Sequence, residues 1–479
     1  MNWKLPAAIV IIIALLGVGT YLVMRPSPPF VPGWTGPIPE ERVKIGVFGP
    51  MEFSQGAHMW HGAVMAAEHI NSAGGVRIGD RRVPIELVKV DTNEILSASD
   101  AKSAVERAIT VDKVDFCIGG FRTESVWGML ETAMDHRKIW LICGSATDEL
   151  CTQTVPVNYD RYKYLFRVTP IKSTYLFYVS TKLLRTVVEE IRENLGIAEP
   201  KVAVLAEKLA WADRIADLAT KPYQGFAGTP YENKSLLEAS LGVKVVGAWR
   251  PSHVATDLTS ELTAIKNTGA HIIFTVFSGP VGVTFGRQWG ELQVPAAAVG
   301  INVEAQKKSY WEETKGYCEY ELLMTTYVPG VAIVENLTVP WVEEYMNRYN
   351  DYPTYEAGTY DAVFLLAEAI TRVGGKENVD AIVAELERTG TRPDLMQTYR
   401  NFPDGVGTAG RLLFDNNHDV RWGPGLVTGL GAQWRNGGLV GVHPYEDTAG
   451  PLTGLPAFGT YPGTVPYRLP PRVVSYYAR

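Results

Sequence analysis

Small hydroxyl residues follow two apolar runs of this sequence, and groups of this type are suited to binding an anion. Residues 116–119 (FCIG) precede the segment 120–125 (GFRTES), and residues 139–143 (IWLIC) precede 144–147 (GSAT). Each apolar run predicts a buried strand, and each hydroxyl segment lies where a following helix begins. Hydroxyl groups and free backbone N–H groups at helix N-termini suit a carboxylate or another anion. The same hydroxyls also serve as ordinary helix caps, so both roles stay open.

The second half of the chain has comparable positions after its apolar runs. Trp211 follows 201–205 (KVAVL), residues 278–280 (SGP) follow 271–277, and residues 301–304 (INVE) follow 295–300. Ligands of open parallel sheets collect outside the carboxyl ends of the strands, so these residues are the candidates for ligand contact. A packing role for Trp211 is the alternative.

No motif of a known catalytic site is present. The turn after the first predicted strand lacks the G-x-G-x-x-G spacing, and the chain contains no G-x-S-x-G, G-x-x-x-x-G-K-[ST] or H-E-x-x-H sequence. His58 and His61 have the i, i+3 spacing of two metal ligands, but no Cys, Asp or Glu nearby completes a set. The acidic run 91–94 (DTNE) is better suited to capping the following helix than to binding calcium. The sequence therefore predicts neither an enzyme, nor a metal site, nor a cofactor.

Length and composition indicate a large protein of two lobes. A chain of 479 residues exceeds the size at which one core stops growing, and its net charge of −7 without a basic block argues against nucleic-acid binding. The four cysteines are too few for a disulfide scaffold. Cys143 and Cys151 are near enough in sequence to form one disulfide in an exported protein, although spacing alone cannot establish it.

Apolar runs and helical periodicity alternate from residue 42 onward, which predicts parallel sheets covered on both faces. The predicted strands are 43–48, 85–90, 116–119, 139–143, 201–205, 243–247, 271–277 and 295–300. The predicted helices are 56–71, 97–111, 125–136, 175–194, 257–267, 281–292, 340–350, 355–373 and 379–389.

The first 25 residues predict a membrane anchor or a signal. Residues 6–24 carry no charge, and as a helix they span about 28 Å, close to the roughly 30 Å hydrocarbon core of a bilayer. A cleaved signal peptide is the alternative, and both export the rest of the chain. Residues 26–41 are rich in proline and predict a semi-rigid linker.

The ordered series of segments resembles the leucine/isoleucine/valine-binding protein family, the type I periplasmic binding proteins of ABC importers. The resemblance begins with VKIGVFGP, GAVMAAEHINSAGGV and VDTNE and continues through DFCIGGFRTES, WLICGSATDEL, YLFRVTP, KVAVLAEK and TYDAVFLLAEAI. It implies an α/β fold of two doubly wound parallel-sheet lobes joined by three crossovers. Residues 42–168 and 328–412 would form lobe 1, residues 169–327 and 413–450 lobe 2, and residues 451–479 a C-terminal extension.

The resemblance also implies a ligand site between the lobes. The ligand carboxylate would be held by the loops after the third and fourth strands, and an aromatic residue of lobe 2 would pack on the ligand. The position of the acid that pairs with the ligand ammonium is occupied by Asn302, with Glu304 as a possible substitute. Arg122 and Glu124 add charge at the cleft mouth or form a structural ion pair. The candidate ligand-binding residues are Thr123, Ser125, Ser145, Ala146, Thr147, Trp211, Phe277, Asn302, Arg122 and Glu304.

The function implied by the resemblance is that of an extracellular or periplasmic substrate-binding protein. It would capture a small polar solute, such as a branched-chain or other amino acid or a related amide or carboxylate. It would deliver the solute to an ABC permease with its ATPase subunits, held at the cell membrane by residues 6–24. The alternative is the ligand-binding ectodomain of a sensor that acts with a separate signalling chain.

Overall fold

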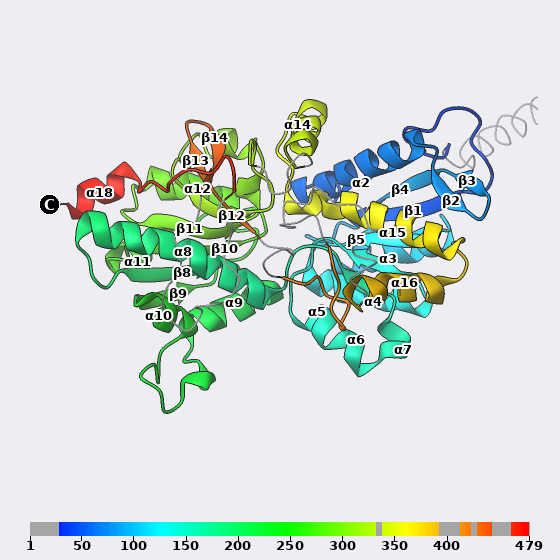
Figure 1. Ribbon diagram of the computed structural model, residues 1–479. Coiled ribbons are helices and arrows are strands. Elements are labelled where there is room, and N and C mark those ends of the chain that lie inside the picture. The colour runs from blue at the N-terminus through cyan, green and yellow to red at the C-terminus, as the bar shows by residue number, and fades with distance from the viewer. Residues whose placement is uncertain (1–27, 332–337, 392–411, 423–428, 443–460, 479) are drawn as a thin grey trace, which may run out of the picture.

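Two parallel sheets form the centres of two lobes that lie side by side in the computed structural model (Figure 1). The structure describes residues 28–331, 338–391, 412–422, 429–442 and 461–478. Most of the runs that the sequence assigned to strands are buried on both faces, because helices cover each sheet from both sides. The edge strand β9 (Lys244–Trp249) is partly exposed. The predicted α/β class with two parallel-sheet lobes is confirmed.

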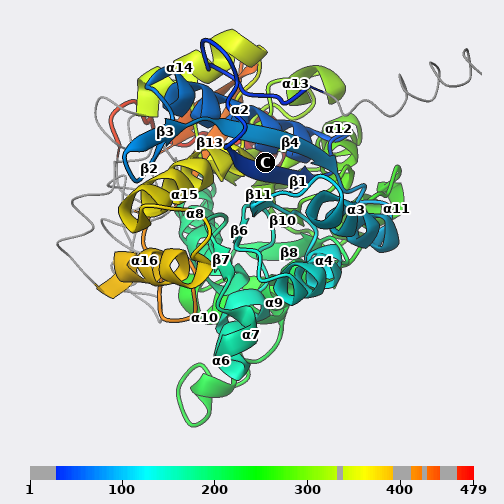
Figure 2. The same cartoon turned by 90° about the vertical axis from the view of Figure 1, so that its right-hand side faces the viewer.

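Lobe 1 is built on a parallel sheet covered by two pairs of helices (Figure 2). Its strand order is β4 (Ile85–Asp91), β1 (Val43–Gly49), β5 (Phe116–Gly119), β6 (Trp140–Ile142) and β7 (Leu165–Arg167). The helices that pack on it are α2 (Ser54–Ser72) with α15 (Thr359–Val373), and α3 (Ala98–Thr110) with α4 (Thr123–Asp135). A short hairpin of β2 (Val76–Ile78) and β3 (Arg81–Val83) lies beside α15. The carboxyl ends of β1, β5 and β6 face lobe 2.

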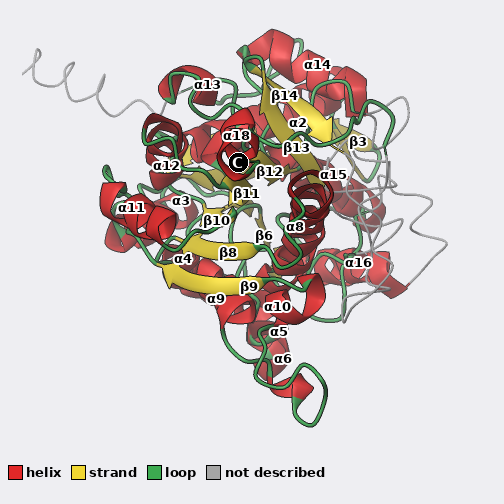
Figure 3. Cartoon of the chain, turned by 90° about the vertical axis from the view of Figure 1, so that its left-hand side faces the viewer, coloured by secondary structure: helices red, strands yellow, loops and turns green. Residues whose placement is uncertain are grey.

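Lobe 2 has a mixed sheet in which one strand, β13 (Leu430–Arg435), pairs antiparallel with both of its neighbours (Figure 3). Its order is β14 (Gly438–Val442), β13 (Leu430–Arg435), β12 (Leu322–Thr325), β11 (Ala297–Asn302), β10 (Ile272–Phe277), β8 (Lys201–Ala206) and β9 (Lys244–Trp249). The covering helices include α8 (Ser173–Leu195), α9 (Ala210–Thr220), α10 (Leu236–Leu241), α11 (Thr259–Asn267) and α12 (Val281–Glu291). The long helix α8 ends at Gly196, whose φ of 67° suits glycine.

The chain passes between the lobes more than once. It enters lobe 2 between β7 and α8, and returns to lobe 1, where α14 (Thr338–Tyr349) and α15 pack against α2. Residues 412–422 also lie against lobe 1, because Asp419 forms a buried ion pair with Arg167 of β7 and His418 stacks on Phe166. The sequence placed residues from 413 onward in lobe 2, whereas in the structure lobe 2 resumes with β13.

Both ends of the described chain are docked on a lobe. The backbone carbonyl of Phe30 accepts a hydrogen bond from Leu87 N of β4 (2.9 Å), and its ring packs on Trp60. Residues 28–37 therefore lie along lobe 1, whereas the sequence predicted a semi-rigid linker for residues 26–41. At the other end, α18 (Pro471–Tyr477) lies against lobe 2, with the Arg472 guanidinium over Trp289 at 3.6 Å.

The predicted membrane segment, residues 6–24, lies outside the described residues. Among the residues that the structure describes, no helix combines the length and the apolar character needed to cross a membrane.

Candidate functional site

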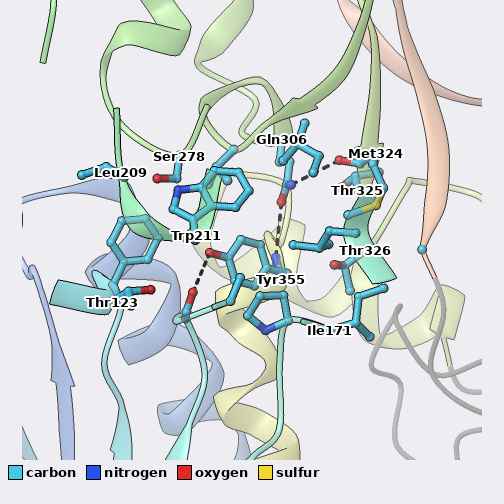
Figure 4. A pocket seen from close by; sticks show the side chains of 18 of the residues that line it. Thr123, Ile171, Leu209, Trp211, Ser278, Gln306, Met324, Thr325, Thr326 and Tyr355 are labelled. Carbon is cyan, nitrogen blue, oxygen red and sulfur yellow. Dashed lines mark hydrogen bonds between the residues drawn. The ribbon is translucent and has the colours of Figure 1, made fainter. Parts of the chain in front are cut away.

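A cavity lies between the two lobes, at the carboxyl ends of their strands (Figure 4). The space amounts to about 650 Å³, counting the part that opens to solvent. Lobe 1 contributes the loops after β5 and β6 together with Tyr355, and lobe 2 contributes the loops after β8, β10, β11 and β12. The lining residues are Phe121, Arg122, Thr123, Gly144, Ala146, Pro170, Ile171, Leu176, Leu209, Trp211, Ser278, Ile301, Val303, Gln306, Met324, Thr325, Thr326, Tyr355 and Gly429.

A pair of hydroxyl groups forms part of the lobe 1 wall. Thr123 lines the cavity, and its Oγ1 atom lies 2.8 Å from the Ser145 Oγ atom, with either one as the donor. Both side chains are buried. When Ser145 donates, the Thr123 hydroxyl keeps its proton for a ligand oxygen.

Two glycines allow the loops that carry these hydroxyls to approach each other. Gly119 ends β5 with a φ of 97°, and a Cβ atom there would lie 2.1 Å from the Phe48 carbonyl oxygen. A Cβ atom on Gly144 would lie 2.3 Å from the Gly120 carbonyl oxygen. Glycine at both positions is therefore required for the close backbone packing that brings the two loops together.

The N-terminus of α4 faces the same cavity. Its N-cap residue, Arg122, makes no side-chain capping hydrogen bond, so the first backbone N–H groups of α4 have no side-chain cap. The Arg122 guanidinium donates to the Ile95 carbonyl oxygen (3.1 Å) and pairs with Glu124 (3.3 Å). The structural ion pair considered for Arg122 and Glu124 is thus present, and Arg122 also lines the cavity. Partial positive charge at the helix start and the guanidinium both favour an anion here.

Glu94 fixes the loop after β5 from behind. Its carboxylate accepts hydrogen bonds from the backbone N–H groups of Phe121 (2.9 Å) and Arg122 (2.8 Å), and burial raises its pKa to about 7. The expectation that residues 91–94 cap α3 is wrong, because Ser97 is the N-cap and accepts from Asp100 N. The acidic run instead positions the cavity wall.

Arg167 fixes the loop after β6 in a similar way. Its Nη1 atom donates to the carbonyl oxygens of Ser145 (3.1 Å) and Thr147 (2.7 Å), while the rest of the guanidinium pairs with Asp419. All of these groups are buried. A buried cation with a full set of acceptors holds the loop rigidly, and the loop in turn holds the Ser145 hydroxyl.

Trp211 forms the main apolar surface on the lobe 2 side, and a buried carboxylate orients it. The indole Nε1 atom donates to Glu207 Oε1 (2.8 Å), and the same carboxylate accepts from the Ser278 hydroxyl and from Gly279 N (3.1 Å). Burial raises the pKa of Glu207, and these hydrogen bonds oppose the shift. Because Ser278 donates to Glu207, its hydroxyl offers a ligand an acceptor rather than a proton.

Tyr355 and Gln306 meet between the lobes. Figure 4 shows Trp211 and Tyr355 pointing into the same space from opposite sides of the cavity. The Tyr355 hydroxyl donates to the Gly144 carbonyl oxygen (3.3 Å). Gln306 of lobe 2 accepts from Tyr355 N and donates to the Met324 carbonyl oxygen, both at 3.4 Å.

Direct hydrogen bonds join the rims of the two lobes. Gln55 Nε2 of α2 donates to Glu304 Oε1 (2.7 Å) and to the Ser278 carbonyl oxygen (3.1 Å) on the lobe 2 side. The Glu124 carboxylate of lobe 1 accepts from Ala210 N, the first amide of α9 in lobe 2 (2.9 Å). The structure therefore represents a closed arrangement of the lobes around the cavity.

The structure places the candidate ligand-binding residues in two groups. Arg122, Thr123, Ala146 and Trp211 line the cavity, and Ser145 lies directly behind Thr123. The other side chains do not line it. The Ser125 hydroxyl donates to the Glu94 carbonyl oxygen and Thr147 donates to Glu149; Phe277 packs in the core beside Phe285, and Glu304 pairs with Lys307 and Gln55.

Asn302 is engaged within lobe 2. Its Nδ2 atom donates to the Tyr310 hydroxyl (2.9 Å) and to Glu321 Oε1 (2.8 Å), on the side of the sheet where α12 packs. Burial raises the pKa of Glu321 to about 7. Its neighbour Ile301 lines the cavity instead, because successive strand residues point to opposite faces.

Several lining or supporting residues were not identified from the sequence. Tyr355 follows no predicted strand and reaches the cavity only because the chain returns to lobe 1. Gln306 lies in lobe 2, two residues beyond the segment 301–304 that the sequence singled out. Glu207 could have been identified from the sequence, because it is an acidic residue directly after a buried apolar run. Gln55 is adjacent to the first strand-end loop, but its partner Glu304 lies 249 residues away.

The cysteine pair and the histidine pair that the sequence singled out both have structural contacts within lobe 1. The predicted disulfide between Cys143 and Cys151 is wrong: both thiols are free and buried in the lobe 1 core, the Cys143 Sγ atom donates to the Leu141 carbonyl oxygen, and burial raises the pKa of both. His58 and His61 both contact the Tyr345 hydroxyl, at 2.5 and 3.2 Å. Within the described ranges, no group of three His, Cys, Asp or Glu side chains is placed to hold a metal ion.

Comparison with known proteins gives one family match. Residues 42–411, well over half of the chain, match a family model described as periplasmic binding protein. No match was found among the curated proteins.

Solved structures with the same fold bind different small molecules. The leucine-binding protein LivK of Thermotoga maritima is 21% identical, with a TM-score of 0.60 over 83% of this chain and 97% of that chain. LivJ of Streptococcus pneumoniae, in complex with isoleucine, is 18% identical, with a TM-score of 0.61 over 83% and 98%. A solute-binding protein of an ABC transporter from R. palustris, in complex with benzoate, is 14% identical, with a TM-score of 0.60 over 88% and 98%. Identities this low show the fold alone.

Proposed function

Because the chain belongs to the periplasmic binding protein family, as its resemblance predicted, we propose that it is the solute-binding protein of an ABC importer. It captures a small solute between its lobes, outside the cytoplasm, and presents it to a permease with its ATPase subunits. The relatives of known structure that bind leucine, isoleucine and benzoate support a small organic acid or amino acid as the ligand class.

The observation that carries this proposal is the cavity between the lobes, lined by both of them and joined across its rim by hydrogen bonds. A site divided between two bodies is completed only when the bodies close. A ligand that contacts both lobes therefore favours the closed form over the open form by its differential affinity.

The order of events follows from which groups each lobe supplies. The hydroxyl pair and the start of α4 on lobe 1 receive the polar end of the solute first. Hinge closure then brings Trp211 over its apolar part and forms the Gln55 and Glu124 hydrogen bonds. The closed form is the one that a permease distinguishes from the empty protein.

Residues 6–24 lie outside the described residues, and we propose that they hold the protein at the membrane. A tether keeps the binding protein near the permease and raises its local concentration there. The docking of residues 28–37 on lobe 1 would keep the lobes close to the membrane surface.

Thermal melting of the purified full chain in mild detergent, against amino acids, amides, urea, small carboxylates and sugars, tests the proposal. Partial unfolding and dialysis first remove any solute that purifies with the protein. A thousandfold excess over Kd adds about 4 kcal/mol, enough to raise Tm by several degrees. We expect one chemical class to raise Tm, and Trp211→Ala to reduce the shift. A flat response to the whole panel would overturn the proposal.

A further inference from the structure

The cavity contains no carboxylate side chain among the lining residues that the structure describes. Glu124, Glu207 and Glu304 lie on the surrounding loops, but each already accepts hydrogen bonds or forms ion pairs within the protein. Glu356, next to the lining residue Tyr355, is also buried, but burial raises its pKa to about 8, so it is protonated at neutral pH. Among these described acids, none is therefore left with a free charge to pair with a cationic group of a ligand.

The backbone carbonyl oxygens around the cavity are also engaged. Each of four accepts at least one hydrogen bond from the protein. These are Gly144 O from Tyr355 Oη, Ala146 O from Ser173 N and Oγ, Ser278 O from Gln55 Nε2, and Met324 O from Gln306 Nε2. An ammonium group placed here would find no charged partner, and burial of an unpaired charge is strongly unfavourable even where neutral oxygens such as the Ser278 hydroxyl accept from it.

The polar groups of lobe 1 have the opposite character. The Thr123 hydroxyl and the first amides of α4, which have no side-chain cap, are donors, whereas the Arg122 guanidinium is already paired with Glu124. They suit a carboxylate, which accepts only.

Most of the remaining cavity surface is apolar, although Ser278, Gln306 and two threonines also line it. Leu209 and Trp211 lie after β8, Ile301 and Val303 at and after β11, and Met324 in β12. These side chains would cover a hydrocarbon or aromatic body, and they offer it no hydrogen bond.

Building on the proposed function, we infer that the ligand is an apolar organic acid with a carboxylate and no ammonium group. The carboxylate lies at Thr123 and the start of α4, and the apolar body lies against Trp211 and the lobe 2 side chains. An amino acid of the same shape is rejected because its ammonium group would be buried without a counterion.

Matched pairs of compounds test this directly on the wild-type full chain. L-leucine and 4-methylpentanoate differ only by the ammonium group, as do L-phenylalanine and 3-phenylpropanoate. The amide 4-methylpentanamide removes the negative charge and keeps the shape. Isothermal titration calorimetry is expected to give at least tenfold tighter binding for one or both acids than for the corresponding amino acid, and at least tenfold tighter binding than for the amide.

Tighter binding of either amino acid than of its acid would overturn the inference and leave the proposed function standing. Equal binding of acid and amide would overturn the carboxylate assignment. If no compound of the series binds, the inference fails, while a solute from the wider panel that raises Tm would still support the proposed function.

Discussion

Replacing Gln55 with alanine is expected to weaken solute binding by about thirtyfold. Gln55 Nε2 donates across the cleft to Glu304 Oε1 at 2.7 Å and to the Ser278 carbonyl oxygen at 3.1 Å, and the side chain is buried. Both acceptors belong to lobe 2, so these hydrogen bonds exist only when the lobes are closed. In the open form water replaces them, and the substitution acts on the closed form alone.

The magnitude follows from the types of hydrogen bond. A bond to a charged acceptor contributes about 1.5–3 kcal/mol and a neutral one about 1 kcal/mol. Within the described residues the Gln55 Oε1 atom has no hydrogen-bond partner, so its burial offsets part of the gain. Glu304 keeps its ion pair with Lys307 at 2.6 Å, so no charge is left unpaired. A net loss of about 2 kcal/mol in closure remains, which corresponds to roughly thirtyfold in the apparent dissociation constant.

Calorimetry with the solute identified by the melting panel measures the affinity, and small-angle X-ray scattering with and without solute measures closure. The control is Gln224→Ala, the same substitution at an exposed position of η1 (Gln224–Phe226) in lobe 2. The control should bind as the wild type does. If Gln55→Ala binds within twofold of the wild type and compacts equally, the hydrogen bonds of the rim do not contribute to closure and the reasoning is refuted.

Three further predictions concern the cavity walls and a buried acid. Trp211→Ala is expected to weaken binding at least tenfold in calorimetry. Trp211→Phe, which loses the N–H donated to Glu207 but keeps an aromatic ring, should weaken binding less. If both variants bind as tightly as the wild type, Trp211 does not belong to the site. Thr123→Val is expected to weaken binding about tenfold, whereas Thr147→Val, outside the cavity lining, should bind normally; the reverse order would contradict the placement of the polar end. Burial raises the pKa of Glu356 to about 8 from 4.5, so its protonated form stabilises the fold fully below pH 4.5 and this contribution is lost as the pH rises through 8. Denaturant titrations at several pH values should show that the unfolding free energy of Glu356→Gln falls less steeply with pH over that range than that of the wild type. An equal dependence on pH in the two proteins would argue against a proton bound to Glu356.

The strands of both sheets were largely predictable because burial on two faces gives short, uniformly apolar runs. Residues 116–119 form β5 with the predicted bounds, and 139–143 contain β6. The strand β7 was missed because it has three residues and includes Arg167. That charge is stable inside a sheet only because Asp419, 252 residues away, accepts its hydrogen bonds, and local patterns carry no sign of such a partner.

The sequence located the site correctly but did not identify all of the side chains that line it. Strand ends located the correct loops, but the two-residue period of a strand decides which neighbour faces the cavity. Of the two residues that the sequence placed at the end of β10, Ser278 lines the cavity while Phe277 packs in the core. Ile301 lines it while the predicted Asn302 points to the opposite face. A displacement of one residue in sequence is therefore enough to exchange a ligand contact for a core residue.

The polar rim and the apolar centre of the cleft have different effects on which ligand is selected. The rim hydrogen bonds of Gln55 and Glu124 exchange with water on opening, so they stabilise the closed form around any solute and do not distinguish one solute from another. The apolar side chains around Trp211 do not replace contacts with water in this way. If the lobes close over an empty cavity, these side chains have no atoms to contact there. A solute that fills this space supplies the missing contacts and removes its own apolar surface from water, at about 25 cal/mol per Å². Closure should therefore respond to the shape of the solute body, while the donors at Thr123 decide which charged end is accepted.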